Sequence, residues 1–265
     1  MNYRHGYHAG NFADVVKHVA LVAILAHLKK KDTPFAVIDT HAGRGSYDLG
    51  GEQARKTGEA ANGIGRLANL SGPLPPSLAT YLELVGHGGR YPGSPLIAAR
   101  MLRPIDRLAA IEKHPEEAAL LREALAPWRK AVVEEADGYA RLSKLLPPPE
   151  RRGVVLIDPP FEAVDEFAQL AAALRTAHRR FATGIYLVWY PVKAHAQAEA
   201  FVGEALATGA PALTIEIAID APEGRLSRSG LLVLNPPYGF EAEMAAVLAR
   251  LEPALAAQTR LEIRA

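Results

Sequence analysis

The sequence of 265 residues contains no cysteine, and this absence excludes several kinds of site at once. A disulfide framework, a thiolate zinc site and a cysteine-ligated iron–sulfur cluster all require this residue. The chain also lacks an apolar run long enough to span a membrane. Its first residues, 1–11, carry His, Tyr and Arg where a signal peptide would have an apolar stretch. We therefore expect a cytoplasmic protein.

An excess of one charge is also missing, because 30 Lys and Arg face 29 Asp and Glu. Nucleic-acid-binding proteins usually carry a basic excess, so any basic footprint here must be local. Three clusters, Lys29–Lys31, Arg151–Arg152 and Arg179–Arg180, are each explained more simply as solvated helix ends or turns. Arg225 and Arg228 lie in a predicted loop, and we favour these two as phosphate contacts.

Short apolar runs alternate with helical patterns along most of the chain. Strands are predicted over 35–39, 108–112, 131–134, 153–158, 184–190, 213–219 and 231–235. Helices are predicted over 12–30, 95–102, 115–126, 137–145, 162–178, 193–208 and 239–255, the first with Asn11 as N-cap. This rhythm predicts an α/β fold with a mainly parallel, seven-stranded sheet. No helix separates the last two strands, so we expect them to form an antiparallel hairpin at one end of the sheet.

Segment 46–93 breaks this rhythm, being rich in Gly and Pro with weak helical patches around 59–70 and 77–86. We interpret it as a small helical subdomain inserted into a domain made of residues 1–45 and 94–265. A disordered loop is the alternative, although structureless loops of this length are unusual in compact domains. No interface stripe or coiled-coil pattern is evident, so we expect a monomer.

Acidic residues follow successive predicted strands. Asp39 precedes the turn 40–45 with its Gly-x-Gly, Glu112 ends the second strand, and Asp137-Gly138 follows the third. In a parallel sheet such strand ends meet in one crevice, where Glu112 would accept the hydroxyls of a ribose and Asp137 an adenine amino group. Taken singly, the glycine turn is also typical of an ordinary strand-to-loop connection, and Asp137 of an N-cap.

The strongest local signal is Asp158-Pro159-Pro160-Phe161, directly after the fourth strand. The prolines hold a stiff turn without N–H donors, and Asp158 adds a carboxylate acceptor. Together they would accept both hydrogens of a planar amino group such as adenine N6, with Phe161 as a stacking surface. Such a clamp favours transfer of a sulfonium methyl onto that nitrogen, a step that needs no metal.

A second copy of this pattern, Asn235-Pro236-Pro237-Tyr238, follows the last predicted strand. Locally it fits the same clamp. We expect its strand to lie at the margin of the sheet, and we therefore interpret this copy as structural.

His5, His8 and His18 raise the question of a metal site. His5 and His8 are three residues apart, but no further ligand follows at zinc spacing. We expect no metal.

These strand ends and the Asp-Pro-Pro-Phe turn resemble the class I S-adenosylmethionine-dependent methyltransferases. Nearly the whole chain resembles the bacterial 23S ribosomal RNA adenine-N6 methyltransferase J family. The matching blocks are Tyr3–His5, His8–Asn11, Ala13–Val15, Lys17-His18, Asp39–Gly43, Tyr91–Pro95, Ala136–Gly138, Arg151–Gly153, Asp158–Pro160 and Arg180–Gly184. Phe161 departs from the family, in which Tyr is common at this position.

The resemblance implies a Rossmann-like fold, with Asp158 catalytic and the N-terminal segment over the active site. It implies S-adenosylmethionine contacts at His18, His41, Ser94, Glu112, Asp137 and Gly138. Contacts to cofactor or RNA are implied for Tyr3, His5 and Lys17, beside the base pocket formed by Pro159, Pro160 and Phe161.

The function expected is N6-methylation of one adenine in 23S ribosomal RNA, with the base flipped into the Asp158–Phe161 pocket. The absence of cysteine excludes C5 methylation of pyrimidines, which needs a thiol nucleophile. Adenine-N6 methylation of DNA is an alternative that the motif does not separate from this one. Methylation of a protein glutamine through Asn235–Tyr238 is another, and a catalytically silent nucleic-acid-binding protein is a third.

Overall fold

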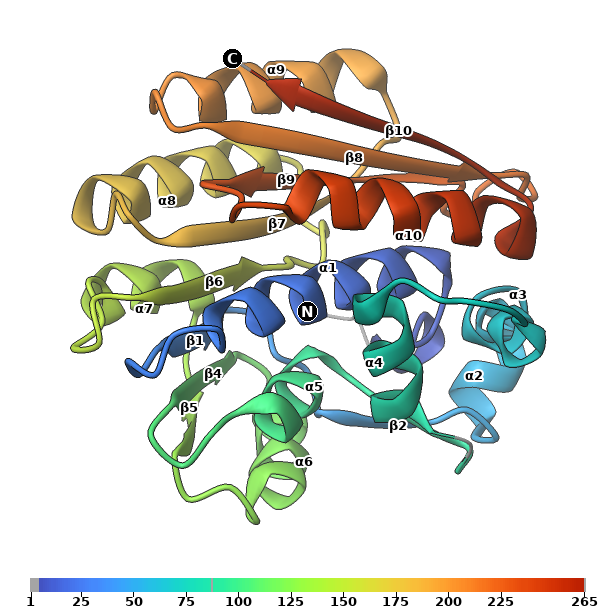
Figure 1. Ribbon diagram of the computed structural model, residues 1–265, viewed down its shortest axis with the longest axis horizontal. Coiled ribbons are helices and arrows are strands. Elements are labelled where there is room, and N and C mark those ends of the chain that lie inside the picture. Colours follow the sequence, from blue (N-terminus) through green and yellow to red (C-terminus); the bar gives the residue numbers. More distant parts are fainter. Residues whose placement is uncertain (1–4, 87, 265) are drawn as a thin grey trace.

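The protein was analysed as a computed structural model, which describes residues 5–86 and 88–264. A central sheet runs in the strand order β10-β8-β9-β7-β6-β1-β4-β5 (Figure 1). Its strands are β1 (Ala36–Asp39), β4 (Arg107–Glu112), β5 (Ala131–Glu135), β6 (Gly153–Ile157), β7 (Ile185–Pro191), β8 (Ala212–Ile219), β9 (Arg228–Leu234) and β10 (Ala257–Arg264). Neighbouring strands from β5 to β7 are parallel, and this confirms the predicted α/β fold with a mainly parallel sheet.

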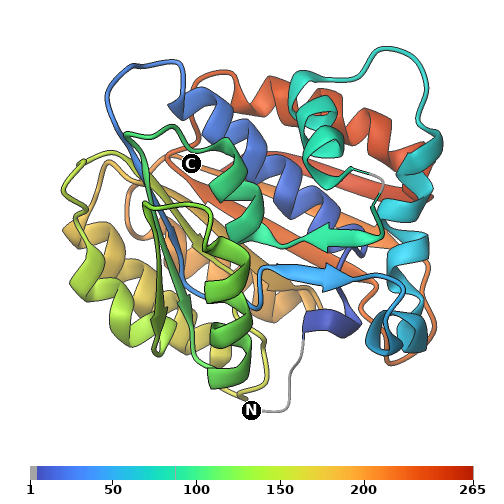
Figure 2. The same cartoon turned by 90° about the horizontal axis from the view of Figure 1, so that it is seen from below.

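Helices cover both faces of the sheet, so the fold has three layers (Figures 1 and 2). One face packs against α7 (Gly138–Leu145), α8 (Glu166–Arg180) and α9 (His195–Leu206). The other face packs against α1 (Phe12–Leu28), α5 (Ser94–Met101), α6 (Pro115–Leu125) and α10 (Phe240–Leu255). Among the described residues, no helix has the length and apolar character needed to cross a bilayer.

Helix α1 lies in the middle of its layer and is buried along almost its whole length. Asn11 caps it as predicted, because its side chain accepts the backbone N–H of Asp14 at 2.9 Å. The sheet covers one side of the helix, while α4 (Pro76–Val85), α5 and α10 cover the other. Polar residues on this helix are therefore forced to find partners inside the protein.

Segment 46–93 begins and ends in a short antiparallel pair, β2 (Ser46–Asp48) and β3 (Arg90–Pro92). Between these strands lie α2 (Glu52–Thr57), α3 (Glu59–Asn62), the 3₁₀ helix η2 (Ile64–Asn69) and α4. Another 3₁₀ turn, η1 (His5–Tyr7), precedes α1.

Two features of the sheet differ from expectation. The sheet has eight strands, because β10 adds an antiparallel edge strand to β8. The last two predicted strands do pair antiparallel, as β8 and β9, but the predicted marginal position of β9 is wrong. Strand β9 lies inside the sheet, between β7 and β8, because β8 and β10 extend the sheet beyond it.

Candidate functional site

A cavity of about 440 Å³ opens at the carboxyl ends of β6, β1, β4 and β5. Because these strands are parallel neighbours, the residues that follow them meet at one edge of the sheet. The residues predicted from the resemblance to contact a cofactor all line this cavity, namely His18, His41, Ser94, Glu112, Asp137 and Gly138. The structure thus brings together residues that are far apart in the sequence.

Glu112 is held rigidly at the end of β4. Its two carboxylate oxygens accept the backbone N–H of Gly43 at 2.8 Å and of His114 at 2.7 Å. Burial raises the pKa of Glu112, and these backbone hydrogen bonds oppose that rise. Each oxygen keeps a further lone pair, so the fixed carboxylate can accept hydroxyl groups from a ligand in the cavity.

Asp137 and His41 lie at the same end of the cavity. Asp137 caps α7 by accepting the N–H of Ala140 at 3.1 Å, and it also pairs with Lys113 Nζ at 2.9 Å. Thr40 Oγ1 donates to a backbone carbonyl and lies 2.8 Å from His41 Nδ1, which indicates that this nitrogen carries the proton. Burial lowers the pKa of His41 to about 4, so the ring is neutral at pH 7.

Gly138 has a steric role that needs glycine. A Cβ atom built at this position would lie 2.1 Å from the backbone oxygen of Thr40. The first turn of α7 therefore lies directly against the end of β1, with no room for a side chain. This contact brings Asp137 and Thr40 to the same wall of the cavity.

Ser94 also lines the cavity, from the first turn of α5. Its hydroxyl donates to Asp39 Oδ2 at 2.7 Å. Asp39 is 1% exposed, and burial raises its pKa to about 7 although the bond from Ser94 opposes this. Asp39, at the carboxyl end of β1, is thus a buried carboxyl group that is only partly ionised near neutral pH.

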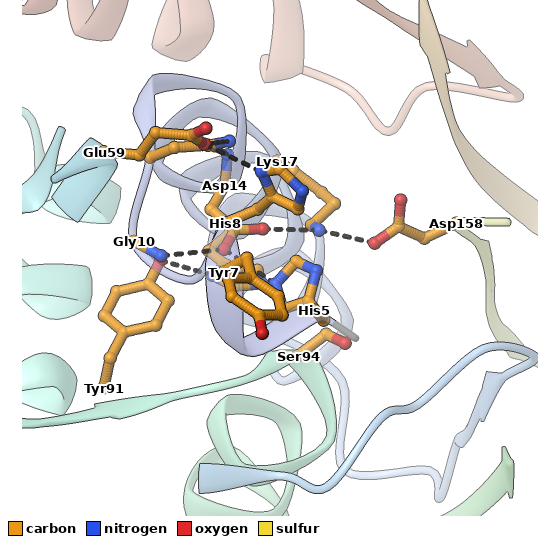
Figure 3. A network of polar contacts seen from close by, with 12 residues as sticks. His5, Tyr7, His8, Gly10, Asp14, Lys17, Glu59, Tyr91, Ser94 and Asp158 are labelled. Carbon is orange, nitrogen blue, oxygen red and sulfur yellow. Dashed lines mark hydrogen bonds and ion pairs between the residues drawn. The ribbon is translucent and has the colours of Figure 1, made fainter. Parts of the chain in front are cut away.

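Lys17 bridges two carboxylates beside the cavity (Figure 3). Its Nζ lies 2.5 Å from Asp158 Oδ2 and 2.7 Å from Asp14 Oδ1. Burial by itself would lower the pKa of Lys17, but the two carboxylates outweigh it and raise this pKa. Burial by itself would raise the pKa of Asp14, but the neighbouring cations hold this pKa well below its usual range. Lys17 and Asp14 are therefore both charged at neutral pH.

His5 joins this cluster, since its Nε2 lies 2.9 Å from Asp14 Oδ2 and its ring packs edge-on against Tyr47 at 5.1 Å. The N–H of Gly10 donates to the same Asp14 oxygen at 2.9 Å. Asp14 therefore ties the turn before α1 to Lys17. Tyr3, which the resemblance places over the active site, lies outside the described residues.

A second cavity, of about 710 Å³, adjoins the first. Both are lined by His5, Lys17, Asp158, Pro160 and Glu162, so the Lys17–Asp158 pair lies where the two cavities meet. The second cavity continues between the start of α1, the end of β7 and the loop between β8 and β9. Pro159 is buried, and it is not among the described residues that line either cavity.

Aromatic rings form part of the wall of this second cavity. Phe161, at a left-handed φ of 51°, packs edge-on against Phe167 at 4.8 Å and against Trp189 at 5.8 Å. The indole Nε1 of Trp189 is buried and has no hydrogen-bond partner within the described part of the chain. The wall of the second cavity therefore includes two aromatic side chains, Phe161 and Trp189.

Basic side chains lie along the far side of the second cavity. Arg225 and Arg228 both line it, and each is also bonded within the protein: Arg225 to the carbonyl of Thr57 and Arg228 to His195. Lys193 lines the same cavity, is exposed, and has no ion-pair partner among residues 5–86 and 88–264.

The second proline turn is remote from both cavities. Because β9 is antiparallel to β7, its carboxyl end points to the opposite edge of the sheet from Asp158. Asn235 Nδ2 there donates to the carbonyls of Ala182 and Gly184, each at 2.8 Å. Its amide is therefore committed to holding the loop before β7. The described residues contain no group of three or more His, Asp or Glu arranged to hold a metal ion.

The model of the RsmJ family, described as "Ribosomal RNA large subunit methyltransferase D, RlmJ", matches residues 32–263. The chain belongs to this family. It is 43% identical over 257 residues to ribosomal RNA large subunit methyltransferase J of Escherichia coli K12, an alignment that covers 94% of the chain and 91% of the relative. The protein of the same name from Haemophilus influenzae is 40% identical, with 96% and 94% covered.

A crystal structure of protein LPL1258 from Legionella pneumophila has the same fold, with a TM-score of 0.89 and 35% identity. The match covers 97% of this chain and 98% of that one. Family membership and this match confirm the predicted resemblance and the Rossmann-like methyltransferase fold.

Several residues of the site were not singled out from the sequence. Asp14 precedes Lys17 by three residues on α1, and this spacing is the only local signal that they pair. Tyr139, whose hydroxyl donates to Glu166 at 2.9 Å, closes the cavity beside His41. Trp189 lines the second cavity beside Phe161. None of these roles has a distinctive sequence pattern.

Proposed function

We propose that this protein transfers a methyl group from S-adenosylmethionine to N6 of one adenine in 23S ribosomal RNA. The observation that carries the proposal is the position of Asp158, at the junction of two cavities. One cavity has the acceptors and the close-packed glycine suited to a nucleoside, and the other has the aromatic and basic walls suited to a base on a phosphate backbone. The relatives named as ribosomal RNA methyltransferases support the same substrate.

The residues of the first cavity fit the cofactor. Glu112 offers fixed carboxylate oxygens for ribose hydroxyls, Asp137 an acceptor for the adenine amino group, and Gly138 the close approach of the backbone. His18, Ser94 and His41 complete the contacts that we assign to it. When bound, the cofactor supplies a methyl group on a positively charged sulfur. In this proposal, no metal takes part.

Asp158 would act directly on the substrate. Lys17 occupies Oδ2, while Oδ1 has no hydrogen-bond partner among the described residues and is free to accept an N6 hydrogen. Pro159 and Pro160 stiffen the turn that carries this oxygen. As N6 would bond to the methyl carbon, the bond from that carbon to sulfur would break, and the nitrogen would become positive. A fixed carboxylate stabilises that charge more than it stabilises the neutral amine. The nitrogen would then lose one hydrogen as a proton, to Asp158 Oδ1 or to water. Asp158 is therefore the catalytic residue of the proposal.

We propose that the adenine is flipped out of its stack into the second cavity, between Pro160 and Phe161. His5 and Lys17 would lie over the reacting atoms. Lys193, Arg225 and Arg228 would follow the phosphates on either side of the flipped nucleotide.

Methylation of DNA adenine would use the same clamp, and family membership favours RNA. Methylation of a protein glutamine through Asn235 is disfavoured, because its amide is bonded to two carbonyls at the far edge of the sheet. We further propose a monomer that acts in the cytoplasm. Residues 46–93 would form an inserted subdomain, which the pairing of Ser46 with Pro92 supports because the segment leaves and rejoins the domain at one point.

The test compares Asp158→Asn with Asp165→Asn, a control on the same loop that is exposed and lines neither cavity. Each is expressed in cells that lack the native protein, and N6-methyladenine is mapped across their ribosomal RNA. We expect Asp158→Asn to lose at least about a hundredfold in methylation while cofactor affinity stays near that of the wild type. Asp165→Asn should methylate normally. Retained turnover in Asp158→Asn, or an unchanged methylation map in cells without the protein, contradicts the proposal.

A further inference from the structure

Three buried side chains form a row that leads from segment 46–93 to the cofactor cavity. His18 Nδ1 lies 2.7 Å from the hydroxyl of Tyr91, which lies 2.9 Å from the hydroxyl of Tyr81. Tyr81 belongs to α4 and Tyr91 to β3, and both are fully buried. His18 belongs to α1 and lines the cavity. Two hydrogen bonds thus link α4, in segment 46–93, to a residue that lines the cofactor cavity.

The direction of these hydrogen bonds follows from the end of the row. A tyrosine hydroxyl has one proton to donate. Tyr81 has no partner other than Tyr91 among the described residues, so its proton must point to Tyr91 or stay unpaired in the interior. Tyr91 then accepts from Tyr81 and donates its own proton to His18 Nδ1. The reverse direction would strand the Tyr81 proton in a buried site.

This direction fixes the state of the imidazole. An acceptor at Nδ1 requires that the ring proton of His18 be on Nε2. Burial lowers the pKa of His18 to about 3, so the ring does not take a second proton at neutral pH. Nε2 has no hydrogen-bond partner in the described part of the chain. It is therefore a neutral donor available to the cavity that His18 lines.

We propose that Tyr81 and Tyr91 are positioning residues, which hold His18 in the tautomer protonated at Nε2 and so present an N–H donor to an anionic oxygen of the cofactor. The matching group is the carboxylate of the amino-acid part of S-adenosylmethionine, because an N–H donor cannot bind the ammonium. This assignment of the ligand rests on the proposed function. The assignment of the tautomer rests on the hydrogen-bond geometry.

The tautomer is testable in the wild-type protein without cofactor. Nitrogen-15 spectra of protein labelled at histidine distinguish protonated from unprotonated ring nitrogens, and a His18→Gln sample identifies the signals of His18. We expect an unprotonated Nδ1 and a protonated Nε2 at pH 7. A proton found on Nδ1 overturns the proposal. This measurement needs no variant of the two tyrosines to fold.

Binding of S-adenosylmethionine, measured by calorimetry, tests the consequence. Tyr91→Phe removes the donor to His18, so we expect roughly three- to tenfold weaker binding and a mixture of tautomers. Tyr81→Phe removes only the bias on Tyr91, and we expect a loss of about twofold. The control is Tyr186→Phe, which also removes a buried hydroxyl, one that donates to the carbonyl of Phe181 far from the cavity. We expect wild-type binding from it.

The outcomes separate the two proposals. Wild-type affinity and an unchanged tautomer in Tyr91→Phe overturn the positioning role, whatever the protein methylates. A protein that shows the expected tautomer and the expected order of affinities, but methylates no ribosomal RNA, supports the positioning role and overturns the proposed function.

Discussion

Lys17 and Asp158, 141 positions apart in the chain, form an ion pair of 2.5 Å at the point where two cavities join. The ammonium is also bonded to Asp14 at 2.7 Å, and its side chain is 4% exposed. One buried cation thus pairs with two carboxylates, one on its own helix and one after the end of β6. The stability of α1 and the geometry of the proposed active site therefore depend on the same group.

Removing the cation should cost both stability and activity. In Lys17→Met, two carboxylates lose their buried partner, and we expect the free energy of unfolding to fall by about 3–5 kcal/mol. Chemical denaturation measures this loss. The double variant Lys17→Met with Asp14→Asn should recover part of the stability, because one uncompensated charge is gone. Additive effects of the two substitutions would contradict the pairing.

Asp39 should make stability depend on pH. Its pKa is raised to about 7 in the folded protein, so between about pH 4 and pH 7 the folded state binds more protons than the unfolded state. Stability from this group is therefore lost as the pH rises through this window. Relative to Asp39→Asn, the wild type should lose roughly 2–4 kcal/mol of unfolding free energy from pH 4 to pH 7.5. Denaturation curves for both proteins across this range would show it, and a constant difference would refute it.

Glycine at position 138 should be required for both folding and cofactor binding. Gly138→Ala would force a Cβ atom to within 2.1 Å of the Thr40 oxygen, so α7 must move away from β1. We expect a loss of about 1–3 kcal/mol in stability and at least tenfold weaker cofactor binding. Gly203→Ala is the matched control, since nothing lies within 4 Å of its Cβ position on α9. It should raise stability by up to about 1 kcal/mol.

Lys193 should contribute to RNA binding without affecting the cofactor. Lys193→Ala removes an exposed cation beside the second cavity, and we expect RNA affinity to fall by about three- to tenfold, with a weaker dependence on salt. Lys144→Ala serves as the control, because Lys144 is exposed on α7 and lines neither cavity. Filter binding at several salt concentrations distinguishes them. Equal losses in the two variants would show that the effect is a general one of net charge.

Much of the fold was predictable because its elements have strong local patterns. Helix α1 and its Asn11 cap, and the buried strand β6, agree with the sequence to within about two residues. Strand β10 was missed because it is an edge strand with only two large apolar residues, Leu261 and Ile263, of which Ile263 is 66% exposed. The pair β2 and β3 was missed because strands of three residues have no readable periodicity.

The site was predictable to the extent that it follows strand ends. The placement of Glu112 and Asp158 beside one cavity could be predicted, because parallel strands bring their carboxyl ends to one edge of the sheet. The partners of His18 could not, because Tyr91 and Tyr81 meet it through the packing of α1 against segment 46–93. The bond of Lys17 to Asp158 likewise depends on the packing of α1 against the sheet. Hydrogen bonds between distant segments depend on tertiary packing, which a single sequence does not specify.

The antiparallel direction of β9 has a consequence for predicting sites from such sequences. The motifs Asp158–Phe161 and Asn235–Tyr238 each combine a polar residue, two prolines and an aromatic ring. They follow strands that run in opposite directions, so they lie at opposite edges of the sheet. A search for the tetrapeptide alone would rank them as equals. Chain direction places Asp158 beside two cavities and Asn235 against the loop before β7.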